Sequence, residues 1–251
     1  MAKIAHFRFY EELNDFLPAV SRKKSYPYRF SGSPSVKDAI EAIGIPHTEV
    51  DLILVNGDSV GFNYQLSEND RISVYPVFES LNISGIGKLR DKPLRNPAFI
   101  LDVHLGKLAK YLRMTGFDTL YEKNYVDSEI VEISHKERRI ILTRDIGILK
   151  HKTIRHGYWV RSQNPKEQFR EVIKRFDLYD IIRPFHRCIN CNGLISKIQK
   201  DQIVNQLEPN TRNYYHEFYR CGSCKKIYWK GSHYERMQKF ILSLGDNQNK
   251  P

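Results

Sequence analysis

Two short apolar runs that each stop at an aspartate decide the fold: AFILD at residues 98–102 and IILTRD at residues 140–145. Apolar runs without polar alternation are typical of buried strands in a parallel sheet. In open α/β sheets, ligands bind beyond the carboxyl ends of the strands. The two runs therefore predict a parallel sheet that presents Asp102 and Asp145 to one crevice.

Strand and helix signals alternate from residue 98 to about residue 180. Leu105, Leu108, Ala109 and Leu112 recur at helical spacing, and a second helix is expected from Asp127 to about Glu137. Short strands are expected at residues 119–121 and 158–160, and a last helix follows the N-cap and proline at residues 164–165. Repeated β-α units of this kind predict an α/β domain with a parallel, three-layer sheet.

Asp102 and Asp145 can be interpreted in two ways. Each could cap the helix that follows its strand, because Asp is among the preferred N-cap residues. Alternatively, Asp102 and Asp145 form an oxygen-only metal site with Asp127, which lies at a helix start beside Glu129. Such clusters suit Mg²⁺ or Mn²⁺, which can activate water and neutralise charge on a phosphodiester.

The four cysteines form two C-x-x-C pairs, Cys188 with Cys191 and Cys221 with Cys224. Two such pairs supply four thiolates for a tetrahedral Zn²⁺ site. Because 29 residues separate the pairs, we expect an inserted loop or short helix between them. Disulfides are the competing interpretation, and a cytoplasmic chain disfavours them.

Charge is distributed unevenly over the 251 residues, whose net charge is +11. Residues 1–80 hold 8 Lys and Arg against 11 Asp and Glu, a net −3, so the remainder carries 32 against 18, a net +14. A basic surplus of this kind favours a nucleic-acid partner, although solubility alone could explain it. No apolar run approaches membrane-spanning length, and the start does not resemble a signal peptide, so we expect a cytoplasmic protein without a membrane partner.

The first eighty residues predict a small β-grasp unit. Strands are expected at residues 4–9, 52–55 and 72–77, with a helix between Ser35 and Ile43 and a hairpin turn at Asn56-Gly57. Pro76 indicates that its strand ends at a sheet edge. Residues 81–97 are a linker by composition, with glycine and proline among four Lys or Arg residues.

The order and spacing of these motifs closely resemble the Mut-seven C-terminal ribonuclease family. The resemblance lies in LD at 101–102, LGKLAKYLRMTGFD at 105–118, ILTRD at 141–145, CINCNG at 188–193 and YWKGSHYER at 228–236. The stretches GIPHTEVDLILVNG at 44–57 and VYPVF at 74–78 resemble the ubiquitin-like domain often fused ahead of it. The resemblance implies a ubiquitin-like β-grasp domain (1–80), a linker (81–97), a PIN-like ribonuclease domain (98–184), a zinc ribbon (185–240) and a tail (241–251).

The same resemblance implies roles for individual residues. Asp102, Asp127 and Asp145 become the acids that bind the catalytic Mg²⁺ or Mn²⁺, and Glu129 is the candidate for a fourth, because residues 146–150 contain no aspartate. The cysteines hold a structural zinc ion. The expected RNA contacts are the basic residues Lys107, Lys110, Arg113 and Arg144 near the acids, and Trp229, Lys230 and His233 in the ribbon.

We therefore expect a metal-dependent ribonuclease, a hydrolase that cuts RNA internally. Aromatic side chains of the ribbon could stack on unpaired bases, but most of them are expected to pack a small core instead. The alternative is a non-catalytic RNA-binding or scaffold protein that uses the zinc ribbon, with the β-grasp domain recruiting a protein partner. Divalent-dependent cleavage separates the two hypotheses.

Overall fold

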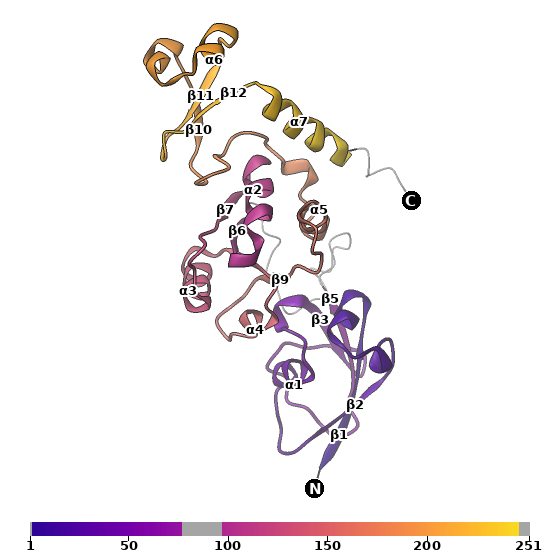
Figure 1. Cartoon of the computed structure of the whole chain (residues 1–251). Coiled ribbons are helices and arrows are strands. Elements are labelled where there is room, and N and C mark those ends of the chain that lie inside the picture. The colour runs from indigo at the N-terminus through magenta and orange to yellow at the C-terminus, as the bar shows by residue number, and fades with distance from the viewer. Residues whose placement is uncertain (1, 77–96, 246–251) are drawn as a thin grey trace. The chain divides into compact units, whose positions relative to one another are not determined.

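A computed structural model describes residues 2–76 and 97–245 of the chain (Figure 1). Its contacts divide the chain into two compact units, which are described separately. One unit contains residues 1–96 and 127–159, and the other contains residues 97–126 and 160–251. Nearly all of the linker expected at residues 81–97 lies outside the described residues, so the proposed domain division stays a prediction.

The first unit begins with a five-stranded sheet in the order β2-β1-β5-β3-β4. The outer pairs are antiparallel, whereas β1 and β5 run parallel in the middle. The strands are β1 (Lys3–Phe9), β2 (Tyr26–Phe30), β3 (Val50–Val55), β4 (Asp58–Ser59) and β5 (Arg71–Pro76). Between them lie helix α1 (Val36–Ile43) and the 3-10 turns η1 (Glu11–Phe16), η2 (Ala19–Ser21) and η3 (His47–Glu49). This arrangement confirms the β-grasp prediction.

Local sequence signals explain where these elements begin and end. The Ser35 hydroxyl accepts a hydrogen bond from the Asp38 N–H, which caps α1, and Gly44 ends the helix with a left-handed φ of 119°. Asn56 and Gly57 both have positive φ, as a two-residue hairpin turn between β3 and β4 requires. Helix α1 and the turn therefore form where the sequence predicts them.

The prediction that the strand of Pro76 ends at a sheet edge is wrong. Strand β5 lies between β1 and β3, and Pro76 is paired with Val50. The proline is tolerated because it is the last residue of its strand, where the ladder of hydrogen bonds ends.

A further sheet has four strands in the order β7-β6-β8-β9. Strands β6 (Ala98–Leu101) and β7 (Asp118–Leu120) are parallel, and so are β8 (Ile140–Thr143) and β9 (Gly157–Trp159). The associated helices are η4 (Val103–Leu105), α2 (Gly106–Met114), α3 (Asp127–Glu137), α4 (Ile146–Leu149), α5 (Pro165–Arg175) and η5 (Tyr179–Ile181). The expected α/β domain with a parallel sheet is confirmed.

A three-stranded antiparallel ribbon and a helix follow in the second unit. The strands are β10 (Ile195–Ile198), β11 (Phe218–Cys221) and β12 (Ile227–Trp229). The insertion expected between the cysteine pairs contains η6 (Lys200–Gln202), η7 (Val204–Gln206) and α6 (Pro209–Tyr214). Helix α7 (Ser232–Gly245) continues beyond the boundary expected for the ribbon at residue 240.

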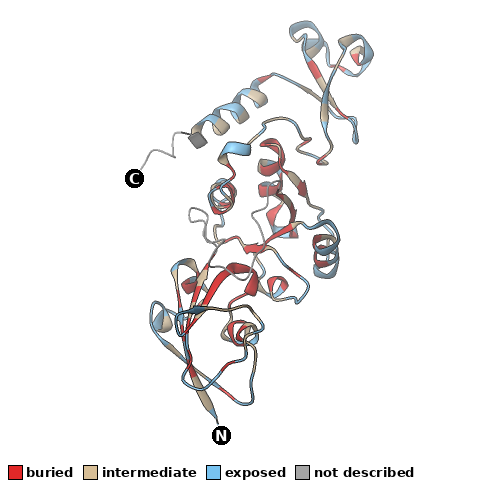
Figure 2. Ribbon diagram, turned by 180° about the vertical axis from the view of Figure 1, so that it is seen from behind, coloured by how far each residue is buried: buried red, intermediate tan, exposed pale blue. Residues whose placement is uncertain are grey.

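Burial follows the apolar pattern of the strands (Figure 2). All four residues of β8 are buried, and so are Phe99, Ile100 and Leu101 of β6. The ribbon has a small core of its own around Ile203, Leu207 and Phe218. Among the described residues, no helix has the length and apolar character needed to cross a membrane.

Candidate functional site

Asp102 follows β6 and is 3% exposed. Its Oδ1 accepts a 2.8 Å hydrogen bond from the backbone N–H of His104. The carboxylate therefore caps the turn η4, and this bond fixes its orientation at the end of the strand.

Asp145 follows β8 and is exposed. Its Oδ1 accepts a 2.7 Å hydrogen bond from Gly147 N–H, while its own backbone N–H donates to Thr143 Oγ1 at 2.8 Å. Asp145 thus caps α4, and the capping role that the sequence left open is present at both strand ends. A carboxylate that caps through one oxygen retains a second oxygen that can bind a cation.

Asp127 and Glu129 are exposed residues in the first turn of α3. Asp127 and Asp145 belong to the first unit, whereas Asp102 belongs to the second. Each acid is therefore placed within its own unit, and the assembly of the three into one metal site stays a prediction. Their donor chemistry fits Mg²⁺ or Mn²⁺, because all are carboxylates and two are held by backbone N–H groups.

The basic residues expected to line the site differ in exposure. Lys107 and Lys110 are exposed on α2, and Arg144 is half-buried beside Asp145. The phosphate contacts of these three residues stay a prediction.

Arg113 has a different role from the RNA contact expected of it. It is 4% exposed, and its guanidinium donates to the carbonyl oxygens of Thr119 at 2.9 Å, Asn190 at 2.7 Å and Tyr121 at 3.4 Å. All three guanidinium nitrogens are engaged, and burial lowers the pKa of Arg113. The side chain is a structural link between α2, β7 and the first cysteine pair, so Arg113 is not available to bind phosphate.

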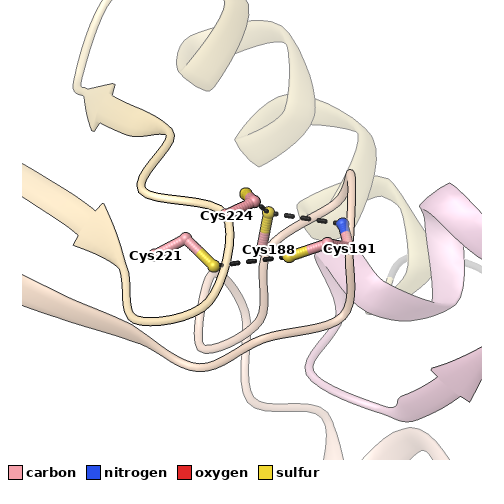
Figure 3. A group of neighbouring side chains, drawn as sticks. All are labelled: Cys188, Cys191, Cys221 and Cys224. Carbon is pink, nitrogen blue, oxygen red and sulfur yellow. Dashed lines mark hydrogen bonds between the residues drawn. The ribbon is translucent and has the colours of Figure 1, made fainter.

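The four cysteines converge from two loops (Figure 3). Their sulfur atoms all lie within 4.8 Å of one another, with Cys188 and Cys224 separated by 3.6 Å and Cys191 and Cys221 by 3.4 Å. All four are free thiols, so the disulfide interpretation does not hold. Tetrahedral zinc with Zn–S bonds of about 2.3 Å places sulfurs roughly 3.8 Å apart, close to these separations. The group could therefore hold a structural metal ion such as zinc.

The phenol of Tyr228 lies against this group, with Oη 2.9 Å from Cys188 Sγ. Burial acts to raise the pKa of Cys188, but hydrogen bonds from Tyr228 and the backbone of Cys191 and Asn190 outweigh it and lower the pKa to about 7. Such donors to a ligating sulfur orient it and tune the metal site. Nothing in the residue spacing marked Tyr228 for this role.

The first cysteine pair is joined to the edge strand β7. Asn192 Oδ1 accepts from Thr119 N–H at 3.0 Å, and its Nδ2 donates to Asp118 Oδ1 at 2.8 Å. Arg187 completes the junction by donating to Asp118 Oδ2 at 3.0 Å. The thiol group and the α/β core of the second unit are therefore directly connected, a connection that the sequence did not reveal.

The ribbon residues expected to contact RNA lie on its surface. Trp229 is 38% exposed, and its ring centroid lies 6.3 Å from that of Tyr215. Lys230 is exposed and ion-paired with Glu217 at 2.8 Å, while His233 is exposed near Arg236. Trp229 is accessible for stacking, whereas the charge of Lys230 is partly compensated.

Comparison with known proteins adds two family matches. The model of the Mut7-C RNAse domain matches residues 97–241, and the model of the Mut7-C ubiquitin domain matches residues 2–82. No curated protein and no solved structure matches the chain.

Proposed function

Because the chain belongs to the Mut7-C RNAse domain family, we propose that it is a metal-dependent ribonuclease that cuts RNA internally. The observation that carries the proposal is the placement of Asp102 and Asp145, each of which follows a buried strand and accepts a backbone hydrogen bond. A catalytic role needs carboxylates held in a fixed geometry.

In this proposal Asp102, Asp127 and Asp145 hold Mg²⁺ or Mn²⁺, and Glu129 is the candidate for a further ligand. A bound ion of this class supplies an activated water and neutralises charge on the phosphate. Lys107 and Lys110 contact backbone phosphates, with Arg144 as a further candidate, and these contacts orient the strand.

RNA is the substrate that suits the charge of the second half of the chain. The ribbon, residues 185–240, carries ten Lys and Arg against four Asp and Glu, a net +6. Trp229 offers an exposed ring that can stack on an unpaired base, with Lys230 and His233 beside it. We infer that the ribbon holds RNA while the acids cut it.

We further infer that the metal of the ribbon is zinc, bound by Cys188, Cys191, Cys221 and Cys224 in a structural role. Four thiolates favour zinc over hard cations such as Mg²⁺. The free thiols also suit a reducing compartment such as the cytoplasm.

The test is a comparison of Asp145→Asn with the wild type on an RNA pool in Mg²⁺, in Mn²⁺ and in EDTA, followed by mapping of the RNA ends. Asparagine caps a helix as well as aspartate does, so this change removes the charge and keeps the cap. Cleavage should fall at least a hundredfold while RNA affinity stays near that of the wild type. Glu132→Gln, an exposed acid on α3, is the control for loss of one charge.

The alternative is a non-catalytic RNA-binding protein, which the capping bonds of Asp102 and Asp145 favour because capping alone explains both residues. RNA binding without divalent-dependent cleavage by the wild type would establish it. Wild-type activity in Asp145→Asn would instead show that Asp145 does not bind the catalytic metal.

A further inference from the structure

The turn η3 of the β-grasp domain buries polar side chains to an unusual degree. His47 is 7% exposed, Thr48 1% and Glu49 0%. Burying a carboxylate is costly unless polar partners compensate the lost water. The partners of Glu49 and His47 include residues more than a hundred positions away in the sequence.

Residues 154–159 provide these partners. The backbone N–H of Trp159 donates a 2.6 Å hydrogen bond to Glu49 Oε1. His47 Nε2 lies 2.8 Å from the carbonyl oxygen of Ile154, which can only accept, so Nε2 is the donor. The opposite ring nitrogen of His47 lies 2.5 Å from Glu41 Oε1 on α1.

An aromatic contact strengthens the same junction. The ring of Phe16, at the end of η1, lies with its centroid 5.0 Å from that of Trp159. Two elements of the β-grasp domain, η1 and η3, therefore contact the strand β9.

Strand β9 stands last in the order of its sheet. A strand in that position presents backbone N–H groups that have no neighbouring strand to bind. Glu49 accepts the hydrogen bond of one such group, at Trp159. The β-grasp domain thus provides a hydrogen-bond acceptor for the outermost strand of this sheet.

The segment held in this way begins at the candidate catalytic acid. Asp145 caps α4, whose buried Leu149 packs so closely on Gly157 that a Cβ there would lie 2.5 Å from Leu149 Cδ2. Residues 145–159 are therefore anchored by β8 at one end and by η3 at the other.

We propose that His47 and Glu49 are positioning residues, through which the β-grasp domain fixes the segment from Asp145 to Trp159. The surface of the β-grasp domain formed by η1 and η3 thus has its partner in residues 154–159 of the same chain. The catalytic consequence rests on the proposed ribonuclease function, whereas the positioning of the segment does not.

Hydrogen exchange on the full-length protein tests the proposal. In Glu49→Ala, the amides of residues 146–159 should exchange about tenfold faster, because the hydrogen bond from Trp159 N–H to the Glu49 side chain is lost. Exchange in β1 should stay unchanged, which separates a local effect from global unfolding. Glu49→Gln keeps an acceptor and should restore most of the protection, and Glu68→Ala, an exposed acid in the same domain, is the matched control.

Kinetics give a second readout. Glu49→Ala should lower kcat about tenfold with little change in KM, because Lys107, Lys110 and the ribbon residues proposed to bind RNA lie outside residues 145–159. Glu49→Gln should recover kcat. If Glu49→Ala does not fold, Phe16→Leu weakens the same junction from a half-buried position.

Unchanged exchange of residues 146–159 in the folded variants would overturn the proposal. If the wild type cuts no RNA but the exchange of residues 146–159 still increases in Glu49→Ala, the proposed ribonuclease function is wrong and the positioning contact is supported.

Discussion

The guanidinium of Arg113 on α2 donates a 2.7 Å hydrogen bond to the carbonyl oxygen of Asn190, which lies between the two cysteines of the first pair. The same side chain donates to Thr119 O on the edge strand β7. Because Asn192 binds Thr119 N–H, both backbone groups of this edge residue are satisfied by side chains. The α/β core of the second unit and the thiol group therefore share one polar network.

Replacing Arg113 should weaken both parts of this network. Arg113→Ala leaves buried carbonyl oxygens without donors and should lower the free energy of unfolding by about 3 kcal/mol. Arg113→Lys keeps the charge but has a single ammonium group, and should lower it by about 1–2 kcal/mol. Urea unfolding measures both, with the exposed Arg212→Ala as the control. A loss no larger than the control's would show that the network contributes little.

Tyr228→Phe should change the titration of the metal-free thiols. The hydrogen bond from Tyr228 helps to lower the pKa of Cys188 from 9.0 to about 7, so its removal should move thiolate formation to higher pH. Because the pKa of Cys188 is lower in the folded protein, ionisation of this thiol stabilises the fold. The contribution is complete above pH 9 and is lost as the pH falls through 7. Thiolate absorbance against pH measures the shift, with Tyr219→Phe on β11 as the control. An unchanged titration in Tyr228→Phe would contradict the role of the phenol.

Gly116→Ala should be strongly destabilising. Gly116 has a φ of +97°, and a Cβ there would lie 2.3 Å from the carbonyl oxygen of Arg183. We expect a loss of more than about 2 kcal/mol, from both the backbone conformation and the clash. Gly32→Ala is a matched control, because its φ of +71° carries a similar conformational cost while no atom lies within 4 Å of its Cβ. The thermal unfolding midpoints of the two variants should differ clearly, and equal midpoints would rule out the clash.

Lys107→Gln and Lys110→Gln should reduce the salt dependence of RNA binding. Each phosphate contact that is lost should flatten the slope of log affinity against log salt by about 0.7 for single-stranded RNA. Lys24→Gln, an exposed change in the β-grasp domain, should leave the slope unchanged. Equal slopes for all three variants would show that Lys107 and Lys110 on α2 do not contact the RNA phosphates.

Elements with strong local signals were predictable from the sequence. Helix α3 spans Asp127–Glu137 as its pattern indicates, and the Asn56-Gly57 turn joins β3 to β4. Strand β2 was not predicted, because Pro27 interrupts a run of five residues. A proline is compatible with the edge position that β2 occupies, where no further strand needs the missing N–H.

The role of Arg113 shows the limit of reading a site from charge. Its position four residues after Ala109 and eight after Leu105 places it on the buried stripe of α2, a signal that the sequence contains. The interpretation as a phosphate contact came from the family resemblance and took no account of this stripe. The contacts of Glu49 and Asn192 could not be predicted, because they join segments 110 and 73 residues apart.

The two outer strands of the nuclease sheet, β9 and β7, receive these side-chain hydrogen bonds at different times during synthesis. Glu49 precedes β9 in the chain, so its hydrogen bond to Trp159 is available as soon as that strand leaves the ribosome. Asn192 follows β7 and lies next to Cys191, so the bond to Thr119 must await translation of the first cysteine pair. Until the first cysteine pair has been translated, a nascent chain therefore carries β7 as an unprotected edge, the kind of surface on which chains aggregate.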